Sequence, residues 1–518
     1  MSKTIQAVVN ELGCGELRYK AAMQARAAEQ RRSERLWSYY ANPMRSVGEV
    51  TDRSERPYRQ AQEWGIPARI TGYYPGADPL HDGPMLNIER KEVVVENDIA
   101  WRLDTMVDYL FGRLPQMRST SGDAEHRQRV EQVLVAIFEH NGGIRLLQQI
   151  ALIGAVHGCV DVAVTLDVAA LEELLKRASG SMMTGDTGDT LTSGTGEIKP
   201  TGNTATLRQW SILEMARLVS LRIIEPARTL LLTDPEDAMR VIALGQMYEI
   251  AQPQSRSPGG GIRRLFGGAD AGGRAQEVLE LWSNQGWWKW RDGELQASGG
   301  NTLGKIPVAH IQNTAVPFAY GGGSDVEALI PMQDELNTRL SDRAHRIAMQ
   351  SFKMYLGMGT TTLKTELPAP GRVWEESVDA DIKELGGDAS CPAEDLHISE
   401  VREAMDKASG VPPVAAGAIR NRIGNLTSAA ALRVTLMSLL ARTERKRALY
   451  GEGLKRMCEL SLEWLSVAGV FASDPDQRGI EMHWPDPLPE SNAQKLQDSK
   501  LKLELGLGRE VVLKELGY

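Results

Sequence analysis

The sequence is poor in cysteine and in aromatic residues: its 518 residues include four cysteines and only 6% Phe, Trp and Tyr. The cysteines stand far apart and form no CxxC pair, so the usual spacing of zinc ligands is absent. Widely spaced thiols are typical of a reducing compartment, and we expect them to be buried structural residues. They are Cys14, Cys159, Cys391 and Cys458.

Motifs for catalysis are also missing. There is no GxxxxGK[ST] phosphate loop, and LGKIPV lacks its spacing, so we expect no ATP hydrolysis. The histidines form no HExxH or similar group, and no GxSxG or Cys/His arrangement indicates a hydrolase. GDTGDT lacks the carboxylates of a calcium loop. We therefore expect no enzyme, no cofactor and no metal site.

The chain lacks a positive charge excess and a long apolar run. Its net charge of -9, from 59 basic and 68 acidic residues, excludes a protein that coats nucleic acid in general, so any such contact is local. The most apolar stretch, IALIGAVHGCVDVAV, contains His157 and Asp161 and is too short to span a membrane. The first residues lack the blocks of a signal peptide. We expect a soluble intracellular assembly without a membrane partner.

What the sequence does contain predicts an α+β fold. ENDIAWRLDTMVDYLFGRLP predicts an amphipathic helix, and short β-like runs fill residues 205–320. WKWRDGELQA predicts a hairpin with Asp292 and Gly293 in the turn. Trp288 and Trp290 would then share a face, which we interpret as packed against the sheet, because no basic groove favours base stacking. Two Gly-rich insertions, 179–204 and 253–275, are expected on the surface.

Three long helices follow. Residues 324–350 begin with Ser324 and Glu327, the pattern of a capping box. An apolar seam continues along the predicted helix: Val326, Leu329, Leu336, Leu340, Ala344 and Ile347. After a Gly/Pro-rich, strand-like segment, a second helix starts between Pro392 and Ser399 and is expected to expose an acidic face. The face holds Glu400, Glu403 and Asp406, with Arg402 and Lys407 beside them.

A nearly neutral loop separates the second helix from the third. SGVPPVAAGAIRNRIGNLTSAAALR carries its charges at Arg420, Arg422 and Arg433 and is rich in Gly and Ala. The segment from 427 to 467 can then run helical for about 60 Å, with Gly451 and Gly453 as the expected kink.

Two blocks of this sequence resemble portal proteins of tailed double-stranded-DNA bacteriophages. The two blocks are GGGSDVEALIPMQDELNTRLSDRAHRIAMQSFKMYLG and ISEVREAMDKASGVPPVAAGAIRNRIGNLTSAAALRVTLMSLLARTERKR. Two shorter segments are similar to the N-terminal wing of that family: ENDIAWRLDTMVDYLFGRLP and NTLGKIPVAHIQN. The resemblance covers most of the chain from about Leu36 to Trp484, and both insertions depart from the family pattern.

The resemblance implies a ring, usually of twelve subunits, and a division of the chain. Its parts would be an N-terminal wing (1–323), stem helix 1 (324–350), a β-rich clip (351–393), stem helix 2 (394–409), a tunnel loop (410–426), a long wing helix with a returning strand (427–489) and a helical crown (490–518).

The resemblance also implies roles for residues. The tunnel loop would narrow a DNA channel with Gly417, Arg420, Asn421, Arg422, Gly424 and Asn425, and stem helix 2 would line it with Glu400, Glu403, Asp406 and Lys407. Trp374, Glu375 and Glu376 of the clip would contact the packaging motor or the head-tail adaptor, although a role in clip folding is equally open. Arg420 and Arg422 would touch phosphates transiently, or pair with acidic residues of a neighbouring subunit.

The implied partners are double-stranded DNA without sequence preference, the large terminase subunit, the head-tail adaptor, and the major capsid and scaffolding proteins. The implied location is the portal vertex of the virion, after assembly in the host cytoplasm. A non-channel capsid or head-tail adaptor protein remains the alternative. A nucleic-acid-processing enzyme is disfavoured by the acidic balance and the absent phosphate loop.

Overall fold

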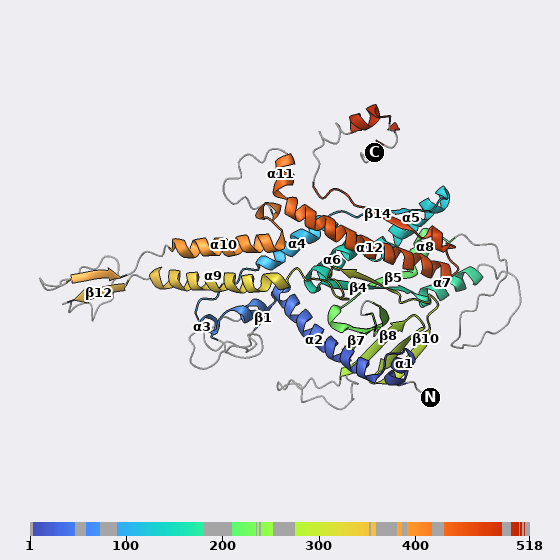
Figure 1. The fold of residues 1–518 in the computed structure, drawn as a ribbon, viewed down its shortest axis with the longest axis horizontal. Coiled ribbons are helices and arrows are strands. Elements are labelled where there is room, and N and C mark those ends of the chain that lie inside the picture. The colour runs from blue at the N-terminus through green and yellow to red at the C-terminus, as the bar shows by residue number, and fades with distance from the viewer. Residues whose placement is uncertain are drawn as a thin grey trace. The chain divides into compact units, whose positions relative to one another are not determined.

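The computed structural model describes residues 4–46, 58–72, 91–180, 210–251 except 235, 238 and 239, 275–351, 354–358, 381–385, 391–416, 429–488, 499–506, 508, 509 and 512 (Figure 1). The chain forms two compact units. The larger comprises Met1–Met106, Gln149–Thr165 and Leu221–Gly453, and the smaller comprises Val107–Gln148, Leu166–Ser220 and Leu454–Tyr518. The larger unit packs several helices with several sheets, which confirms the predicted α+β class.

A five-stranded antiparallel sheet forms one layer of the larger unit. Its strands, in the order β10-β9-β8-β7-β6, are Glu294–Gly300, Gly286–Arg291, Ala275–Ser283, Val241–Ala251 and Thr229–Thr233. Helices α1 (Ile5–Glu11) and α2 (Glu16–Ala41), blue in Figure 1, contribute side chains to the same core. Val8 and Val9 of α1 are buried there with Leu230, Leu279 and Trp290.

The hairpin between β9 and β10 confirms the predicted turn. Asp292 and Gly293 have φ angles of 48° and 79°, as a two-residue type I′ turn requires. Trp290 is 1% exposed and Trp288 packs against the same core, so both tryptophans stabilise the sheet as interpreted. Burial of two such rings removes a large apolar area from water.

The other sheets of this unit are small. Strands β11 (Val308–Gln312), β4 (Cys159–Leu166) and β5 (Val219–Ile224) form a three-stranded sheet with β4 in the centre. Two antiparallel pairs complete the set: β1 (Met44–Ser46) with β2 (Tyr58–Gln60), and β12 (Met354–Met358) with β13 (Asp381–Leu385). The short helical segments are η1 (Ala61–Gly65), α3 (Ala68–Thr71), η2 (Pro226–Arg228), η4 (Glu327–Leu329) and η6 (Pro413–Ala416).

The predicted long helices are present. Helix α4 spans Asp98–Phe111, α9 spans Ile330–Ser351 and α10 spans Pro392–Ser409, and α9 lies beside α10 (Figure 1). Half of the predicted capping box is present, since Ser324 accepts a hydrogen bond from the N–H of Glu327 at 3.3 Å. The Glu327 carboxylate accepts from Arg32 at 2.9 Å, and η4 precedes α9 at this end. The seam predicted along α9 is buried as far as Leu340, whereas Ile347 is 43% exposed.

The third long helix differs from its prediction. Helix α11 (Ala429–Thr435) ends before Leu436, and α12 (Met437–Val467) begins after it. Leu436 is 2% exposed, and its N–H and C=O still make helical hydrogen bonds, so the interruption is a local distortion that buries one side chain. Helix α12 then continues through Gly451 and Gly453, where we had expected a kink. A side chain at Gly453 would collide with Ile311, so this glycine allows close packing.

The smaller unit is mostly helical. It contains α5 (Ala124–His140), α7 (Val168–Gly180), α8 (Ile212–Arg217), the first turn of α6 (Ile144–His157) and the end of α12. Strands β3 (Gln116–Ser119) and β14 (Ile480–His483) pair antiparallel, and η7 (Pro475–Gln477) precedes β14.

Two of the four cysteines, Cys14 and Cys458, are buried as expected, whereas Cys159 and Cys391 are partly exposed; all four are free thiols. No helix in the described part of the chain is both long and apolar enough to span a bilayer.

Candidate functional site

Many of the residues expected to act on DNA or on partners lie outside the described residues. These are Gly417, Arg420, Asn421, Arg422, Gly424 and Asn425 of the predicted tunnel loop, and Trp374, Glu375 and Glu376 of the predicted clip. The channel-lining candidates Glu400, Glu403, Asp406 and Lys407 all lie on α10, which the structure describes in full. Helix α10 is therefore the candidate site.

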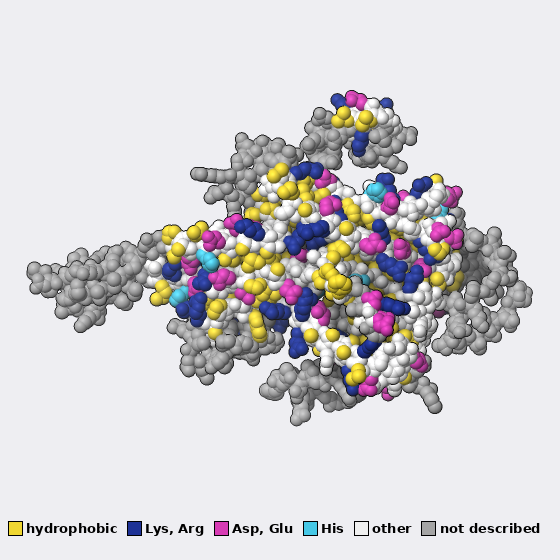
Figure 2. All heavy atoms as spheres, viewed as in Figure 1, with side chains coloured by type: hydrophobic (Ala, Val, Ile, Leu, Met, Phe, Trp, Pro, Cys, Tyr) yellow, Lys and Arg dark blue, Asp and Glu magenta, His cyan; other side chains and the backbone are white. Residues whose placement is uncertain are grey.

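One face of α10 is open to solvent along its length. Glu400, Glu403 and Lys407 are exposed, as predicted, and Lys407 lies 3.0 Å from Glu403 one turn earlier. Leu396 is 61% exposed on the same face. Figure 2 shows acidic, basic, histidine and apolar side chains interspersed over the α9 and α10 pair at the left of the view. Two carboxylates and one ammonium group leave this stripe weakly acidic.

The expected exposure of Asp406 is wrong. Its side chain is 16% exposed, and its Oδ1 lies 2.6 Å from Nη2 of Arg102 on α4. Arg402, expected beside the acidic face, is also turned toward the interior and pairs with Glu96. Position 406 follows 402 by one helical turn, so both side chains point toward α4 and the chain before it.

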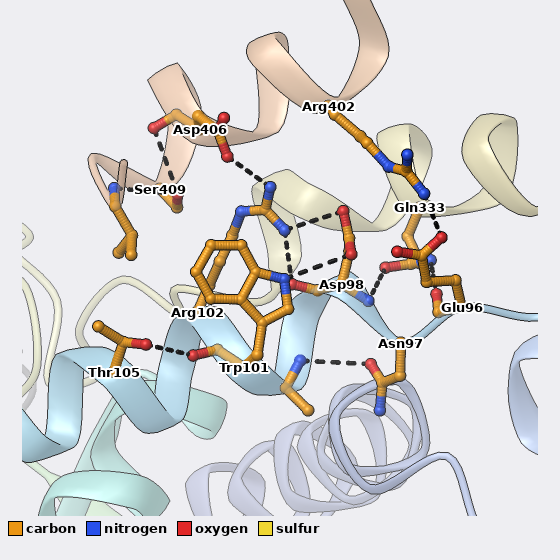
Figure 3. Close-up of polar contacts among 12 residues, drawn as sticks. Glu96, Asn97, Asp98, Trp101, Arg102, Thr105, Gln333, Arg402, Asp406 and Ser409 are labelled. Carbon is orange, nitrogen blue, oxygen red and sulfur yellow. Dashed lines mark hydrogen bonds and ion pairs between the residues drawn. The ribbon is translucent and has the colours of Figure 1, made fainter. Parts of the chain in front are cut away.

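Arg102 is the centre of this junction, which Figure 3 shows between Asp98 and Asp406. It is 1% exposed, donates to the carbonyl of Asp98 at 2.7 Å and lies 3.1 Å from the Asp98 carboxylate. The Trp101 ring covers its guanidinium, with the ring centroid 4.4 Å from Cζ. Sequence reasoning missed Arg102, although it stands on the apolar face of α4 with Leu103 and Met106. A cation at such a position needs a buried acidic partner.

Helix α9 is fixed by a row of buried polar side chains that the sequence analysis also missed. Gln333, Asn337 and Ser341 recur every fourth residue and are all 0% exposed. Gln333 accepts from the N–H of Asp98 at 3.1 Å, Asn337 accepts from Glu96 at 3.0 Å and Ser341 accepts from Val94 at 3.0 Å. The extended chain before α4 thereby gains hydrogen bonds from α9 in place of a sheet partner.

Ion pairs join α9 to α10. Arg343 lies 3.0 Å from Asp395, Arg346 pairs with Glu394, and His397 lies 3.0 Å from Glu335. Burial opposes ionisation of Glu335, but hydrogen bonds from Arg339 and His397 outweigh it and lower the pKa of this carboxyl. These pairs are partly exposed, so each adds modest stability, and their number fixes the register of the two helices.

The end of α10 is anchored on α12. The helix ends at Ser409, and the cap residue Gly410, with a φ of 69°, donates its N–H to the carbonyl of Asp406. Arg442 donates to the carbonyls of Ala408, at 3.1 Å, and of Ser409. A cation at a helix C-terminus also interacts favourably with the helix dipole. The chain therefore leaves α10 toward residue 417 from a fixed point.

A second buried cation lies further along α12. Lys446 is 4% exposed, donates to Asn313 at 2.5 Å and pairs with Asp325, which lies just before η4. Burial lowers the pKa of Lys446, and the charge of Asp325 opposes that shift. Tyr450 donates to Asn313 at 3.0 Å, so the cluster ties α12 to the chain that leads into α9.

Helix α10 is held on one side by Arg102, Arg402 and the pairs with α9, and the opposite stripe is exposed and weakly acidic. Within the described residues, no group of three or more His, Cys, Asp or Glu side chains could hold a metal ion.

Helices α9 and α10 lie side by side, and the chain between them contains the β12–β13 pair. The comparison with protein families assigns a class to this chain. Residues 241–517, more than half of the chain, match the family model described as phage portal protein, SPP1 Gp6-like. The chain belongs to this family of phage portal proteins.

Solved structures give a weaker likeness. A chain from the virion of a native gene transfer agent particle is 13% identical, with a TM-score of 0.41, over 79% of this chain and 85% of that chain. A chain from the neck of an empty gene transfer agent particle is 13% identical, with a TM-score of 0.42, over 79% of this chain and 86% of that chain. No curated protein matches the chain. The family assignment therefore rests on the family match.

Proposed function

We propose that this portal protein closes into a ring, of about twelve copies by analogy with its family, that surrounds a DNA passage at one vertex of the capsid. The terminase motor packages the genome through the ring, which then retains it and later releases it into the tail. The observation that carries the proposal is the exposed, weakly acidic stripe of α10 on a rigidly anchored helix, in a chain of the portal family.

The parts of the chain are assigned accordingly. Residues 1–323 are the wing, α9 belongs to stem helix 1 (324–350), and α10 to stem helix 2 (394–409). Residues 351–393 form the clip, 410–426 the tunnel loop, 427–489 the long wing helix with its returning strand, and 490–518 the crown. Trp374, Glu375 and Glu376 of the clip are proposed contacts for the motor and then for the head-tail adaptor. Capsid and scaffolding proteins are the proposed partners of the ring during assembly.

The electrostatics of α10 fit translocation better than tight binding. Neutralising many phosphates releases counterions and gives an affinity that holds the duplex in place. Glu400 and Glu403 repel phosphates, and Lys407 offsets one of these charges, so the duplex meets a weak field. Asp406 contributes little to this surface because its side chain is only 16% exposed and is paired with Arg102.

Electron microscopy of the purified protein separates this proposal from a non-channel capsid or adaptor protein. A ring with a central opening wide enough for duplex DNA is expected. A shell or a monomer would decide for the alternative.

The lining role of α10 has its own test. Glu400→Lys together with Glu403→Lys places two cations per subunit on the stripe, and we expect less nuclease-protected DNA per assembled head. Glu294→Lys on β10 is a control for charge reversal away from α10, because Glu294 is also exposed. Equal packaging by the double variant and the control would remove α10 from the channel wall.

The tunnel loop is tested through Arg420 and Arg422. Replacing both with Glu and measuring genome retention in assembled heads distinguishes a phosphate contact from an ion pair with a neighbouring subunit. Unchanged retention would count against contact with DNA.

A further inference from the structure

An apolar segment protrudes from the larger unit between β11 and η4. Phe318 is 92% exposed, the largest value among the large apolar side chains that the structure describes. The four residues before it, 314–317, are exposed as well, and Ala315, Val316 and Pro317 among them are apolar. A single exposed apolar side chain is ordinary, but a contiguous protruding group indicates a contact surface.

The backbone at Phe318 is strained. Its φ of 60° lies in the left-handed region, which a bulky residue rarely adopts. The other two non-glycine residues with positive φ in the described chain are Asn42 and Asp292, whose side chains tolerate this conformation. Strain of this kind persists where the surroundings impose it, and it is concentrated at functional positions.

Hydrogen bonds to the two residues after Phe318 hold this backbone conformation. Gln312 donates to the carbonyls of Ala319, at 2.7 Å, and Tyr320, at 3.0 Å. His310 Nε2 lies 2.8 Å from the same Tyr320 carbonyl, and the Tyr320 hydroxyl donates to Asp161 at 2.6 Å. Residues 319 and 320 are thus fixed to the three-stranded sheet directly after Phe318.

Backbone contacts also hold the two ends of the loop together. The N–H of Gly323 donates to the carbonyl of Thr314 at 2.9 Å. Gly158 and Gly322 approach so closely that a side chain on either would collide with the backbone carbonyl of the other. The loop therefore presents Phe318 in a preset position, and a contact made there loses little conformational entropy.

We propose that Phe318 is the anchor of a contact with a second copy of this chain. The inference rests on the proposed ring, in which each subunit uses two different patches, one of which projects toward the next copy. Residues 313–323, NTAVPFAYGGG, contain no Lys or Arg, so the loop offers nothing to a phosphate backbone. An aromatic side chain with apolar neighbours fits a pocket on a protein surface, where such residues supply most of the binding energy.

The test compares Phe318→Ala with Leu17→Ala in the full chain. Leu17 is 84% exposed but lies on the regular helix α2, so its variant controls for loss of an exposed apolar side chain. Circular dichroism confirms folding, and mass photometry at a series of concentrations gives the ring fraction. We expect Phe318→Ala to weaken the association constant of each contact about 10-fold or more, and Leu17→Ala to leave it unchanged.

A benzophenone amino acid in place of Phe318 identifies the partner directly. After irradiation of the assembled protein, a product of twice the chain mass is expected. A product only within one chain, or with added duplex DNA, would overturn the inference. So would a wild-type ring fraction in Phe318→Ala, although the proposed ring would then still stand. If the wild-type chain itself forms no ring, both proposals fall.

Discussion

Two buried cations hold helices together in the larger unit, and they differ in chemistry. Arg102 contacts the carbonyl and carboxylate of Asp98 on its own helix and the carboxylate of Asp406 on α10. Lys446 contacts Asn313 and Asp325, both from the chain between β11 and α9. A guanidinium remains charged and presents a planar set of donors, whereas an ammonium group is a compact charge whose pKa falls on burial. Arg102 is thus suited to joining several acceptors, and Lys446 to neutralising one.

The Lys446 cluster is predicted to be sensitive to loss of its cation. Lys446→Met leaves Asp325 buried, with Arg442 at 3.4 Å as its remaining cationic partner among the contacts described. We expect a loss of about 3 kcal/mol in the free energy of unfolding, because the buried Asp325 then keeps only the longer contact with Arg442 and its charge is poorly compensated. Urea unfolding followed by circular dichroism measures it.

The double variant Lys446→Met with Asp325→Asn is the control for this effect. Since it removes both charges, it should recover a large part of the lost stability. A double variant that is as unstable as the single one would show that packing of the lysine stem, and not its charge, stabilises this region.

Arg102→Lys sharpens the comparison, because it keeps the positive charge and removes the planar guanidinium group with its several donors. One ammonium group cannot reach Asp98 and Asp406 with the geometry of the guanidinium, so we expect a loss of about 2 kcal/mol. Lys407→Arg, on the exposed face of α10, should change stability by about 0.5 kcal/mol or less. Equal effects of the two substitutions would argue against any special role of the planar side chain at position 102.

The sequence predicted the helices and their order better than it predicted their contacts. The periodicity of α4 and α9 and the Asp-Gly turn between β9 and β10 are local signals, and each was confirmed. The interruption at Leu436 was not predicted, because it depends on where that side chain is buried. Long-range packing has no counterpart in a local pattern.

The candidate site shows the same limit. Glu400, Glu403 and Lys407 were correctly expected on an exposed face of α10, but the pattern could not separate them from Asp406, which is also charged and one turn away. Its burial depends on Arg102, which is 304 residues distant in the chain. The burial of Arg102 could have been predicted from the sequence, since this residue stands among the apolar residues of α4. Its partner Asp406 could not have been predicted in the same way.

The last prediction concerns Asp334, a carboxyl without a cation at hydrogen-bond distance among the contacts described. Asp334 on α9 accepts a hydrogen bond from Tyr39 at 2.8 Å. Burial raises its pKa to about 6 from 3.8, although the Tyr39 hydrogen bond and the charge of Arg35 oppose the shift. A carboxyl whose pKa is higher in the folded state contributes stability at low pH and loses that contribution as the pH rises through about 6. Ionised Asp334 therefore costs stability at neutral pH.

Asp334→Asn should remove that cost, since the amide oxygen can still accept from Tyr39. We expect a gain of about 1–2 kcal/mol at pH 7.5, reduced from the full shift because the site is partly solvated, and a smaller gain at pH 5. Asp342→Asn on the same helix is the matched control with the opposite sign. Asp342 lies 2.5 Å from Arg69, whose hydrogen bond lowers the pKa of this carboxyl, so its substitution should reduce stability at pH 7.5. Thermal unfolding across this pH range measures the stability of both variants. A change of the same sign in both would show that Arg69 and burial do not set these two pKa values apart.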